Sequence, residues 1–129
     1  MTLIVTDIAP AGATIVDAMS TMKIMGLEDL FQQAVNFSSQ IDFSKSKTPD
    51  TVSIFESTIR YVGGLLSAYE LNGNKPQVLV QKAQQLADKL ALGFAASAVP
   101  FGFVDFSANK PVTGSTVRNH PLLSHVIFV

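Results

Sequence analysis

The sequence predicts an all-α fold that begins with two successive helical hairpins. Four segments between residues 13 and 94 carry apolar side chains at the three- and four-residue spacing of amphipathic helices. The segments are separated by connections that contain glycine, asparagine or proline. Strand-prone residues are nearly absent before the end of the chain. Repeated hairpins of this kind suit a solenoid, a bundle or an α/α barrel, and the periodicity does not choose among them.

The first hairpin is expected to contain helices from Ala13 to Met25 and from Glu28 to Phe37, with Gly26 ending the first. Acidic residues open the second helix, where they complement the helix dipole. The side chains expected to face inward are Ile15, Val16, Met19, Met22 and Met25 in the first helix, and Leu30, Phe31, Ala34 and Phe37 in the second.

The second hairpin follows a polar segment, Asp42 to Asp50, that is typical of a surface loop. One long helix is predicted from Val52 to Leu71, with Thr51 or Ser53 as its cap. At about 100° per residue, the apolar arc of this helix comprises Ile54, Phe55, Ile59, Val62, Leu65, Leu66 and Tyr69.

A further helix is expected after the turn Asn72-Gly73, with Pro76 in its first turn. Its inward stripe comprises Leu79, Ala83, Leu86, Ala87, Leu90 and Phe94. From residue 98 the helical period is lost, and the proline- and glycine-rich sequence is typical of loops, with a short extended piece at Phe103 to Phe106. No acidic residue lies near His120 or His125 in the tail, so we predict no metal site there.

The polar side of the long helix is the candidate functional surface. Glu56, Arg60, Gly63 and Ser67 stack along it, and the Glu–Arg pair contributes only about 0.3–0.5 kcal/mol on an exposed helix. Gly63 and the adjacent Gly64 each cost roughly 1 kcal/mol relative to alanine, which indicates close approach by another backbone or by a ligand. From these residues alone, two interpretations stay open: a solvated face with a salt bridge, or a functional site.

Composition excludes some classes of partner. The net charge of −1, with no cluster of lysine and arginine, provides no electrostatic footprint for nucleic acid or anionic lipid. The start of the chain is a poor signal peptide, and no transmembrane segment is predicted. At 47% hydrophobic and 15% charged residues, the chain is more apolar than a free-standing domain of this size needs, so we expect part of its surface to face a missing partner.

The string F-E-S-T-I-R-Y-V-G-G-L-L-S-A-Y, Phe55 to Tyr69, resembles the signature helix of family 47 of the glycoside hydrolases, the class I α-1,2-mannosidases that trim N-linked oligosaccharides. Residues Gly12 to Gly26 are similar to the family's block that contains D-A-L-D-T. Asp17 matches the first aspartate of that block, and Ser20 stands where the second is expected. Residues Val99 to Phe106 resemble a loop of fungal-type members.

This resemblance implies that the chain is a fragment of an (α/α)7 barrel, truncated at both ends. Residues 1–129 would form a single partial domain in which 12–106 match the catalytic domain and 107–129 form a divergent, irregular tail. The family continues past residues 115–117 into a helix that bears carboxylates, and the tail bears no similarity to it. We therefore expect a truncated or mispredicted gene product.

The resemblance also implies a chemistry: inverting hydrolysis of terminal α-1,2-linked mannose from high-mannose N-glycans in the secretory pathway. Glu56 would be the catalytic acid, acting through a water molecule, and Arg60 and Asp17 would bind the substrate. The base and the threonine that anchors the family's Ca²⁺ would lie outside this chain, which supplies no Ca²⁺ ligands.

Two functional hypotheses follow. In the first, the chain is an α-mannosidase sequence whose isolated form lacks turnover. In the alternative, it is a non-catalytic helical-hairpin module that binds a glycan or a protein partner. Apolar barrel edges left uncovered would in either case favour self-association.

Overall fold

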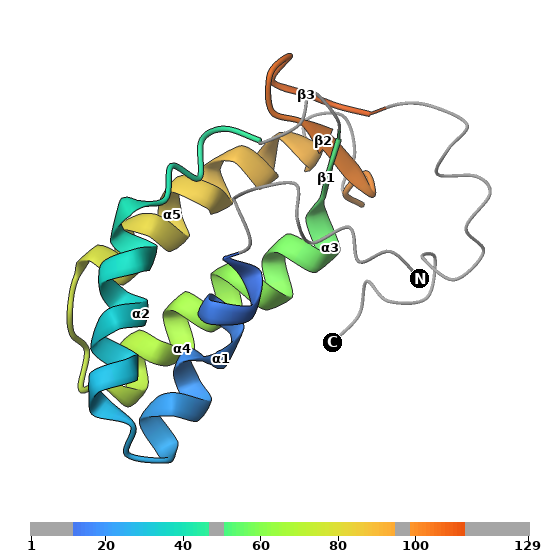
Figure 1. Ribbon diagram of the computed structural model, residues 1–129. Helices are drawn as coiled ribbons and strands as arrows, with labels where there is room; N and C mark the ends of the chain where they lie inside the picture. Colours follow the sequence, from blue (N-terminus) through green and yellow to red (C-terminus); the bar gives the residue numbers. More distant parts are fainter. Residues whose placement is uncertain (1–11, 47–50, 95–98, 113–129) are drawn as a thin grey trace.

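The computed structural model describes residues 12–46, 51–94 and 99–112, and these are mainly helical (Figure 1). The predicted all-α class is confirmed. The first hairpin consists of α1 (Ala13–Ile24) and α2 (Glu28–Gln40). The second hairpin consists of a continuous helical segment, made of α3 (Ile54–Ser57), η2 (Thr58–Val62) and α4 (Gly63–Leu71), followed by α5 (Val78–Leu90) and the short η3 (Ala91–Phe94).

A small sheet completes the described part of the chain. Its strands, in the order β1–β2–β3, are β1 (Val52–Ser53), β2 (Phe103–Asp105) and β3 (Lys110–Pro111). All neighbours are antiparallel, with Val52 opposite Val104 and Asp105 opposite Lys110. The extended piece predicted at Phe103 to Phe106 is therefore confirmed, and the sheet lies where α3 begins and α5 ends (Figure 1).

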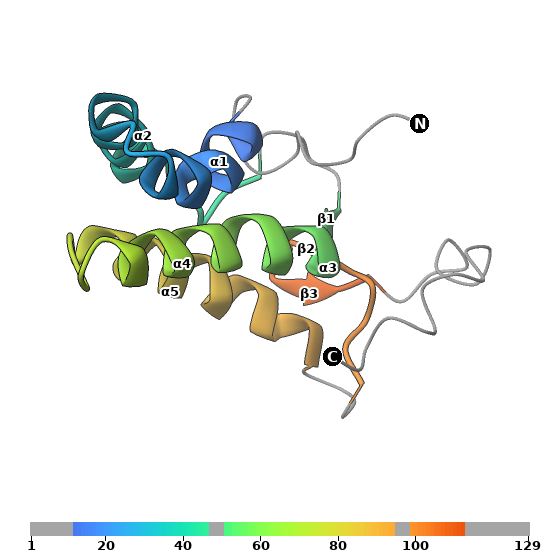
Figure 2. The same ribbon diagram turned by 90° about the horizontal axis from the view of Figure 1, so that it is seen from below.

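The two hairpins form two layers. Figure 2 shows α1 and α2 on one side and α4 and α5 on the other, with α1 packed on both α2 and α4. Apolar side chains from both layers and from the sheet fill one continuous core: Val16, Met19, Phe31, Ala34, Val35, Ile41, Phe43, Val52, Ile54, Tyr61, Leu65, Ala68, Leu79, Ala83, Leu86, Leu90, Val104 and Phe106.

The structure of the first hairpin agrees closely with the prediction from the sequence. Gly26 adopts a positive φ of 70° after α1, and acidic residues occupy the first turn of α2. The expected burial of Met25 and Leu30 is wrong, because these side chains are 66% and 48% exposed at the tip of the hairpin. Ile24 and Leu27 are also exposed there, so the hairpin ends in an apolar tip.

The long helix differs from its prediction in two ways. Val52 and Ser53 belong to β1, and Ser53 caps α3 by accepting a hydrogen bond from the Glu56 N–H at 3.4 Å. The helix also contains a π-helical turn, η2, in which the Gly63 N–H bonds to the carbonyl of Thr58 five residues earlier.

The buried side of this helix is also different from the predicted apolar arc. Ile59 and Leu66 are 47% and 38% exposed, whereas the small residues Gly64 and Ala68 are buried. A methyl group added at Gly64 would lie 2.9 Å from the Val16 carbonyl oxygen, so this glycine allows α1 to approach closely. The small residues therefore determine which side of this helix is buried. A prediction based on large apolar side chains does not identify that side.

The turn into α5 is formed by Gly73, with a φ of 68°, as the sequence predicts. Pro76 lies before the helix rather than in it, because α5 begins at Val78. Its buried residues match four members of the predicted stripe, but Ala87 and Phe94 are exposed. The hairpin itself is confirmed.

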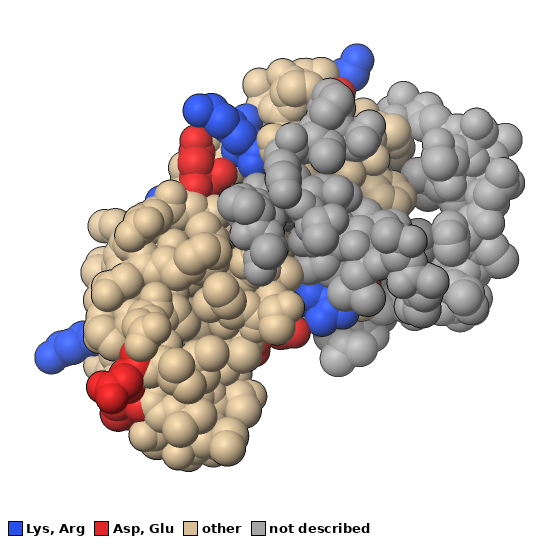
Figure 3. Space-filling view, in the orientation of Figure 1, with Lys and Arg blue, Asp and Glu red and all other residues tan. Residues whose placement is uncertain are grey.

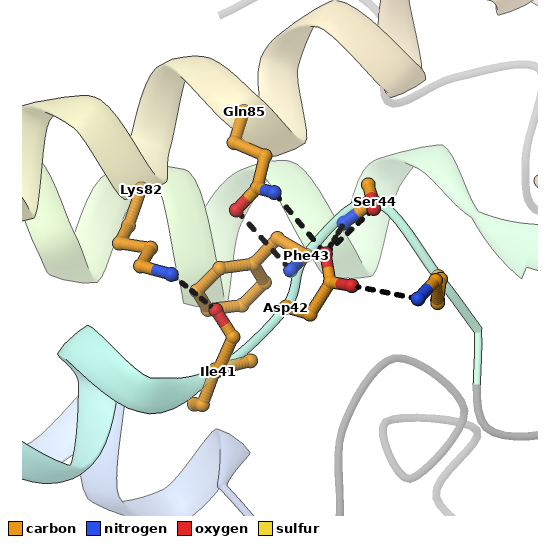
Figure 4. A network of polar contacts seen from close by, with 7 residues as sticks. Ile41, Asp42, Phe43, Ser44, Lys82 and Gln85 are labelled. Atoms are coloured by element: carbon orange, nitrogen blue, oxygen red, sulfur yellow. Dashed lines mark hydrogen bonds and ion pairs between the residues drawn. The ribbon is translucent and has the colours of Figure 1, made fainter.

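The segment after α2 has polar residues at the surface and one buried aromatic residue, Phe43. Figure 4 shows Lys82 and Gln85 of α5 reaching this segment: Lys82 Nζ donates to the Ile41 carbonyl at 2.6 Å, and Gln85 Nε2 donates to Asp42 Oδ1 at 3.1 Å. Between them Phe43 is fully buried, with its ring edge-to-face with Tyr61 at 5.5 Å. The expectation of a simple surface loop is therefore wrong at Phe43.

Asp42 makes the stability of this segment dependent on pH. Hydrogen bonds from the Ser44 hydroxyl and N–H lower the pKa of Asp42 from 3.8 to about 2. A lowered pKa stabilises the fold above the unfolded-state value, and this contribution disappears as the pH falls from about 4 to about 2. In urea titrations, we expect Asp42→Asn to destabilise at neutral pH and the difference from wild type to shrink at about pH 2. Asp88→Asn, on the exposed side of α5, controls for the loss of one charge; an equal pH response of both variants would contradict the prediction.

Candidate active site

The structure brings the three predicted site residues into one hydrogen-bonded group. Arg60 Nε donates to Glu56 Oε2 at 2.8 Å, and Arg60 Nη1 donates to Asp17 Oδ2 at 3.1 Å. One guanidinium thus joins two carboxylates that are 39 residues apart in the sequence (56 − 17). We call Asp17, Glu56 and Arg60 the carboxylate–guanidinium group.

Each member is placed by a local feature of the fold. Ser53 caps α3, so Glu56 lies in the first turn of that helix, and Arg60 lies in the π-helical turn η2. Asp17 follows Val16 in α1, the residue whose carbonyl meets Gly64. The close packing of α1 on the second hairpin therefore determines whether Asp17 can reach Arg60.

The group lies at the surface rather than in the core. The side chains of Arg60 and Glu56 are 31% and 33% exposed, and that of Asp17 is 49% exposed. Ion pairs with this exposure contribute about 0–1 kcal/mol to stability. The arrangement is consequently accessible to a ligand, and the stability of the fold does not depend on it.

Arg60 is a permanent cation in this setting. Its hydrogen bond to Glu56 is the largest effect and raises the pKa of the guanidinium; desolvation is the next largest and lowers it, and the hydrogen bond to Asp17 adds a further, smaller rise. Two carboxylates and a fixed cation can accept and donate hydrogen bonds to neighbouring hydroxyl groups, and a carboxylic acid can transfer a proton. Such a set can bind a ligand that carries hydroxyl groups.

The other polar residues of the long helix contribute less. Ser67 Oγ donates to the Gly64 carbonyl at 3.3 Å, so its hydroxyl is engaged with the helix backbone. Gly63 is exposed, and a methyl group there would meet only the Thr58 carbonyl, at 3.6 Å. The prediction of close approach is thus confirmed for Gly64, where the neighbour is the α1 backbone, and not for Gly63 among the described residues.

The described residues also bear on metals and membranes. Within residues 12–46, 51–94 and 99–112, no three or more His, Cys, Asp or Glu side chains are grouped as metal ligands. His120 and His125 lie outside the described residues. Among the helices of the described segments, none is long and apolar enough to cross a bilayer.

In Figure 3, the charged side chains of the described part lie mostly at the rim of a broad uncharged area.

The helical hairpins define an all-α fold that carries a surface group of two carboxylates and one guanidinium. The sequence model described as "Glycosyl hydrolase family 47" matches residues 4–126. The chain belongs to glycosyl hydrolase family 47. The match extends on both sides of residues 12–106, where the resemblance was expected.

Individual relatives give the same result. The chain is 42% identical over 96 residues to the mannosyl-oligosaccharide 1,2-alpha-mannosidase MNS1 of Arabidopsis thaliana, covering 73% of this chain and 16% of that protein. It is 38% identical over 109 residues to the mannosyl-oligosaccharide alpha-1,2-mannosidase 1B of Aspergillus oryzae, covering 76% and 21%. The chain therefore spans about a fifth of the length of such relatives.

A solved structure confirms the fold. The alpha-1,2-mannosidase from Trichoderma reesei, an (α/α)7 barrel, superposes with a TM-score of 0.72 and 29% sequence identity. The superposition covers 79% of this chain and 24% of that chain. The predicted hairpins are thus part of a family 47 barrel. The roles of Asp17, Glu56 and Arg60 in catalysis stay predictions.

Proposed function

We propose that these 129 residues are one part of the catalytic domain of an α-1,2-mannosidase that removes terminal α-1,2-linked mannose from high-mannose N-glycans. The observation that carries the proposal is the half-exposed guanidinium of Arg60, held between the carboxylates of Glu56 and Asp17. Membership of family 47 and the activities for which the relatives are named support the reaction class. The secretory pathway is the corresponding location.

An inverting glycosidase needs an acid for the leaving oxygen and a base that activates water on the opposite face of the sugar, with the two carboxyl groups about 6.5–9.5 Å apart. In this proposal Glu56, in its protonated form, is the acid, and its proton passes through a water molecule to the glycosidic oxygen. Arg60 orients Glu56 and donates to a sugar hydroxyl, while Asp17 accepts from one. The base comes from a part of the barrel outside this chain.

Family membership also suggests calcium. Within residues 12–46, 51–94 and 99–112, no three or more His, Cys, Asp or Glu side chains are grouped as metal ligands, and Ca²⁺ takes about six to eight oxygen ligands. We therefore assign no residue of the described segments to an ion.

A chimera tests the role of Glu56. In the Trichoderma reesei enzyme, the matching segment is replaced by residues 12–112 of this chain, and release of mannose from an α-1,2-linked mannobiose is measured. We expect Glu56→Gln to lower kcat by about a hundredfold or more, because general acid catalysis contributes about 10²–10⁴. Glu70→Gln, an exposed residue of α4, is the matched control and should leave the rate unchanged.

Equal rates for the chimera and its Glu56→Gln variant would contradict the proposed acid. The alternative function, a non-catalytic module, is supported by the small share of the relatives' length that the chain spans. Binding of mannobiose to the isolated 129-residue chain, with the same affinity in Asp17→Asn as in wild type, would favour a glycan-binding surface elsewhere. Sedimentation of the isolated chain tests the proposed self-association through uncovered edges.

A further inference from the structure

The triplet Asn36-Phe37-Ser38 has the Asn-X-Ser pattern of an N-glycosylation acceptor, and no other triplet in the 129 residues has this pattern or its threonine form. None of its three residues takes part in the proposed mechanism. The triplet lies in the second half of α2, so the packing of that helix determines which of its side chains can be reached. We call these three residues the acceptor triplet.

The asparagine of the acceptor triplet faces solvent. Asn36 is exposed, and so are the other residues of the same side of α2, at about 100° per residue: Asp29, Gln32, Gln33 and Gln40. A helix side made only of polar residues is normally solvated. Gln32 Nε2 donates to Asn36 Oδ1 at 3.4 Å, which engages the oxygen of the amide and not the nitrogen that would carry a glycan. A bulky oligosaccharide on Asn36 would therefore extend away from the core.

The serine of the acceptor triplet is buried. Ser38 is 0% exposed, and its hydroxyl donates to the Ala34 carbonyl at 2.8 Å, one turn earlier in α2. Phe37 packs against the core between the two polar residues. The acceptor pattern demands a hydroxyl two residues after the asparagine, so the transferase has to recognise that hydroxyl. In the folded chain the hydroxyl is out of reach, whereas the product asparagine is not.

We propose that Asn36 accepts one N-linked oligosaccharide, and that the transfer takes place before α2 packs into the fold. Exposure of Asn36 lets the folded chain accommodate the glycan, and burial of Ser38 sets the order of transfer and folding. This inference rests on the proposed function in one respect, because the secretory pathway supplies the transferase and the oligosaccharide donor.

The transfer requires no oxidant or reductant. Nδ2 of Asn36 forms a bond to the anomeric carbon of the oligosaccharide, and the bond from that carbon to the diphosphate of a lipid-linked donor breaks. The lipid diphosphate leaves with the bonding electron pair, and the amide nitrogen gives up one proton. The product is a neutral secondary amide, so the charge of α2 is unchanged.

Translation in the presence of microsomes provides the first measurement. The full chain, behind a cleavable signal peptide, is resolved by electrophoresis before and after treatment with peptide N-glycosidase. We expect one slower band that the enzyme removes, leaving an aspartate in place of Asn36 in the mass spectrum. Asn36→Gln should lose the band, and Ser38→Thr should keep it. Gln33→Ala, which alters the same exposed side of α2, is the matched control and should be glycosylated like wild type.

The order of transfer and folding is tested on purified chain that was made without glycosylation. Folded chain is incubated with the transferase and its lipid-linked donor, beside Phe43→Ala, which removes a fully buried ring. Modification of a transiently opened chain follows the population of the open form, so we expect the Phe43→Ala variant to be modified roughly tenfold faster or more. Phe94→Ala, truncated at a half-exposed side chain, is the control and should react as slowly as wild type.

The outcomes separate this inference from the proposed function. Absence of the slower band in wild type, or its persistence in Asn36→Gln, would overturn the glycosylation site. Equal rates for folded wild type and Phe43→Ala would overturn the order of transfer and folding. Because microsomes supply the secretory lumen, neither assay depends on mannosidase activity. An inactive chimera together with a glycosylated Asn36 would contradict only the proposed function.

Discussion

Phe43→Ala is expected to lower the free energy of unfolding by about 3–5 kcal/mol, the usual loss for a fully buried phenylalanine. The Phe43 side chain is 0% exposed and lies edge-to-face with Tyr61. It also sits where the first hairpin connects to the second, so removing the ring leaves a cavity against η2. Urea denaturation followed by circular dichroism measures the loss, which is a large share of the roughly 5–15 kcal/mol typical of a domain.

Phe94→Ala is the matched control for this variant. The Phe94 side chain is 50% exposed at the end of η3, so its truncation should change stability by about 0.5 kcal/mol or less. Similar losses in the free energy of unfolding for Phe43→Ala and Phe94→Ala would contradict the prediction that burial of the Phe43 ring stabilises the fold.

Gly64→Ala and Gly63→Ala are expected to have opposite effects on the isolated chain. At Gly64 the new methyl group would lie 2.9 Å from the Val16 carbonyl oxygen, and a backbone cannot move aside as a flexible side chain can. Overpacking of this kind costs about 1–3 kcal/mol. At Gly63 the methyl group has space, so the helix gains up to about 1 kcal/mol from the better propensity of alanine.

The comparison needs only two adjacent substitutions of the same chemistry, measured by urea titration under the same conditions. If Gly64→Ala stabilised the chain as Gly63→Ala does, the close contact between α1 and α4 would be wrong. Restoring stability to Gly64→Ala with Val16→Ala would not be expected, because the blocking atom belongs to the backbone.

Much of the fold could be predicted from the sequence, because its signals are local. Helix ends follow from Gly26 and Gly73, which adopt positive φ, and from Ser53 at the N-cap. The stripe of α5 follows from simple periodicity, since that helix buries one side. The family resemblance depends on a string of consecutive residues, and the comparisons confirm it.

The rest could not be predicted because it depends on contacts between distant segments. The long helix is apolar on several sides, so the side chosen for burial depends on where the α1 backbone meets Gly64. The segment that contains Phe43 is bonded to a later helix, because Lys82 donates to the Ile41 carbonyl and Gln85 accepts from the Phe43 N–H. The bond between Arg60 and Asp17 joins two hairpins, and only the family resemblance placed both residues in one site.

That bond has a thermodynamic consequence. Because Asp17 belongs to one hairpin and Glu56 and Arg60 belong to the other, the carboxylate–guanidinium group exists only while the hairpins are docked. A saccharide that forms hydrogen bonds to both hairpins at once would stabilise their contact. Its binding and the association of the two hairpins would therefore be thermodynamically linked, each favouring the other. Core substitutions that loosen the α1–α4 contact would then weaken sugar affinity without touching the sugar.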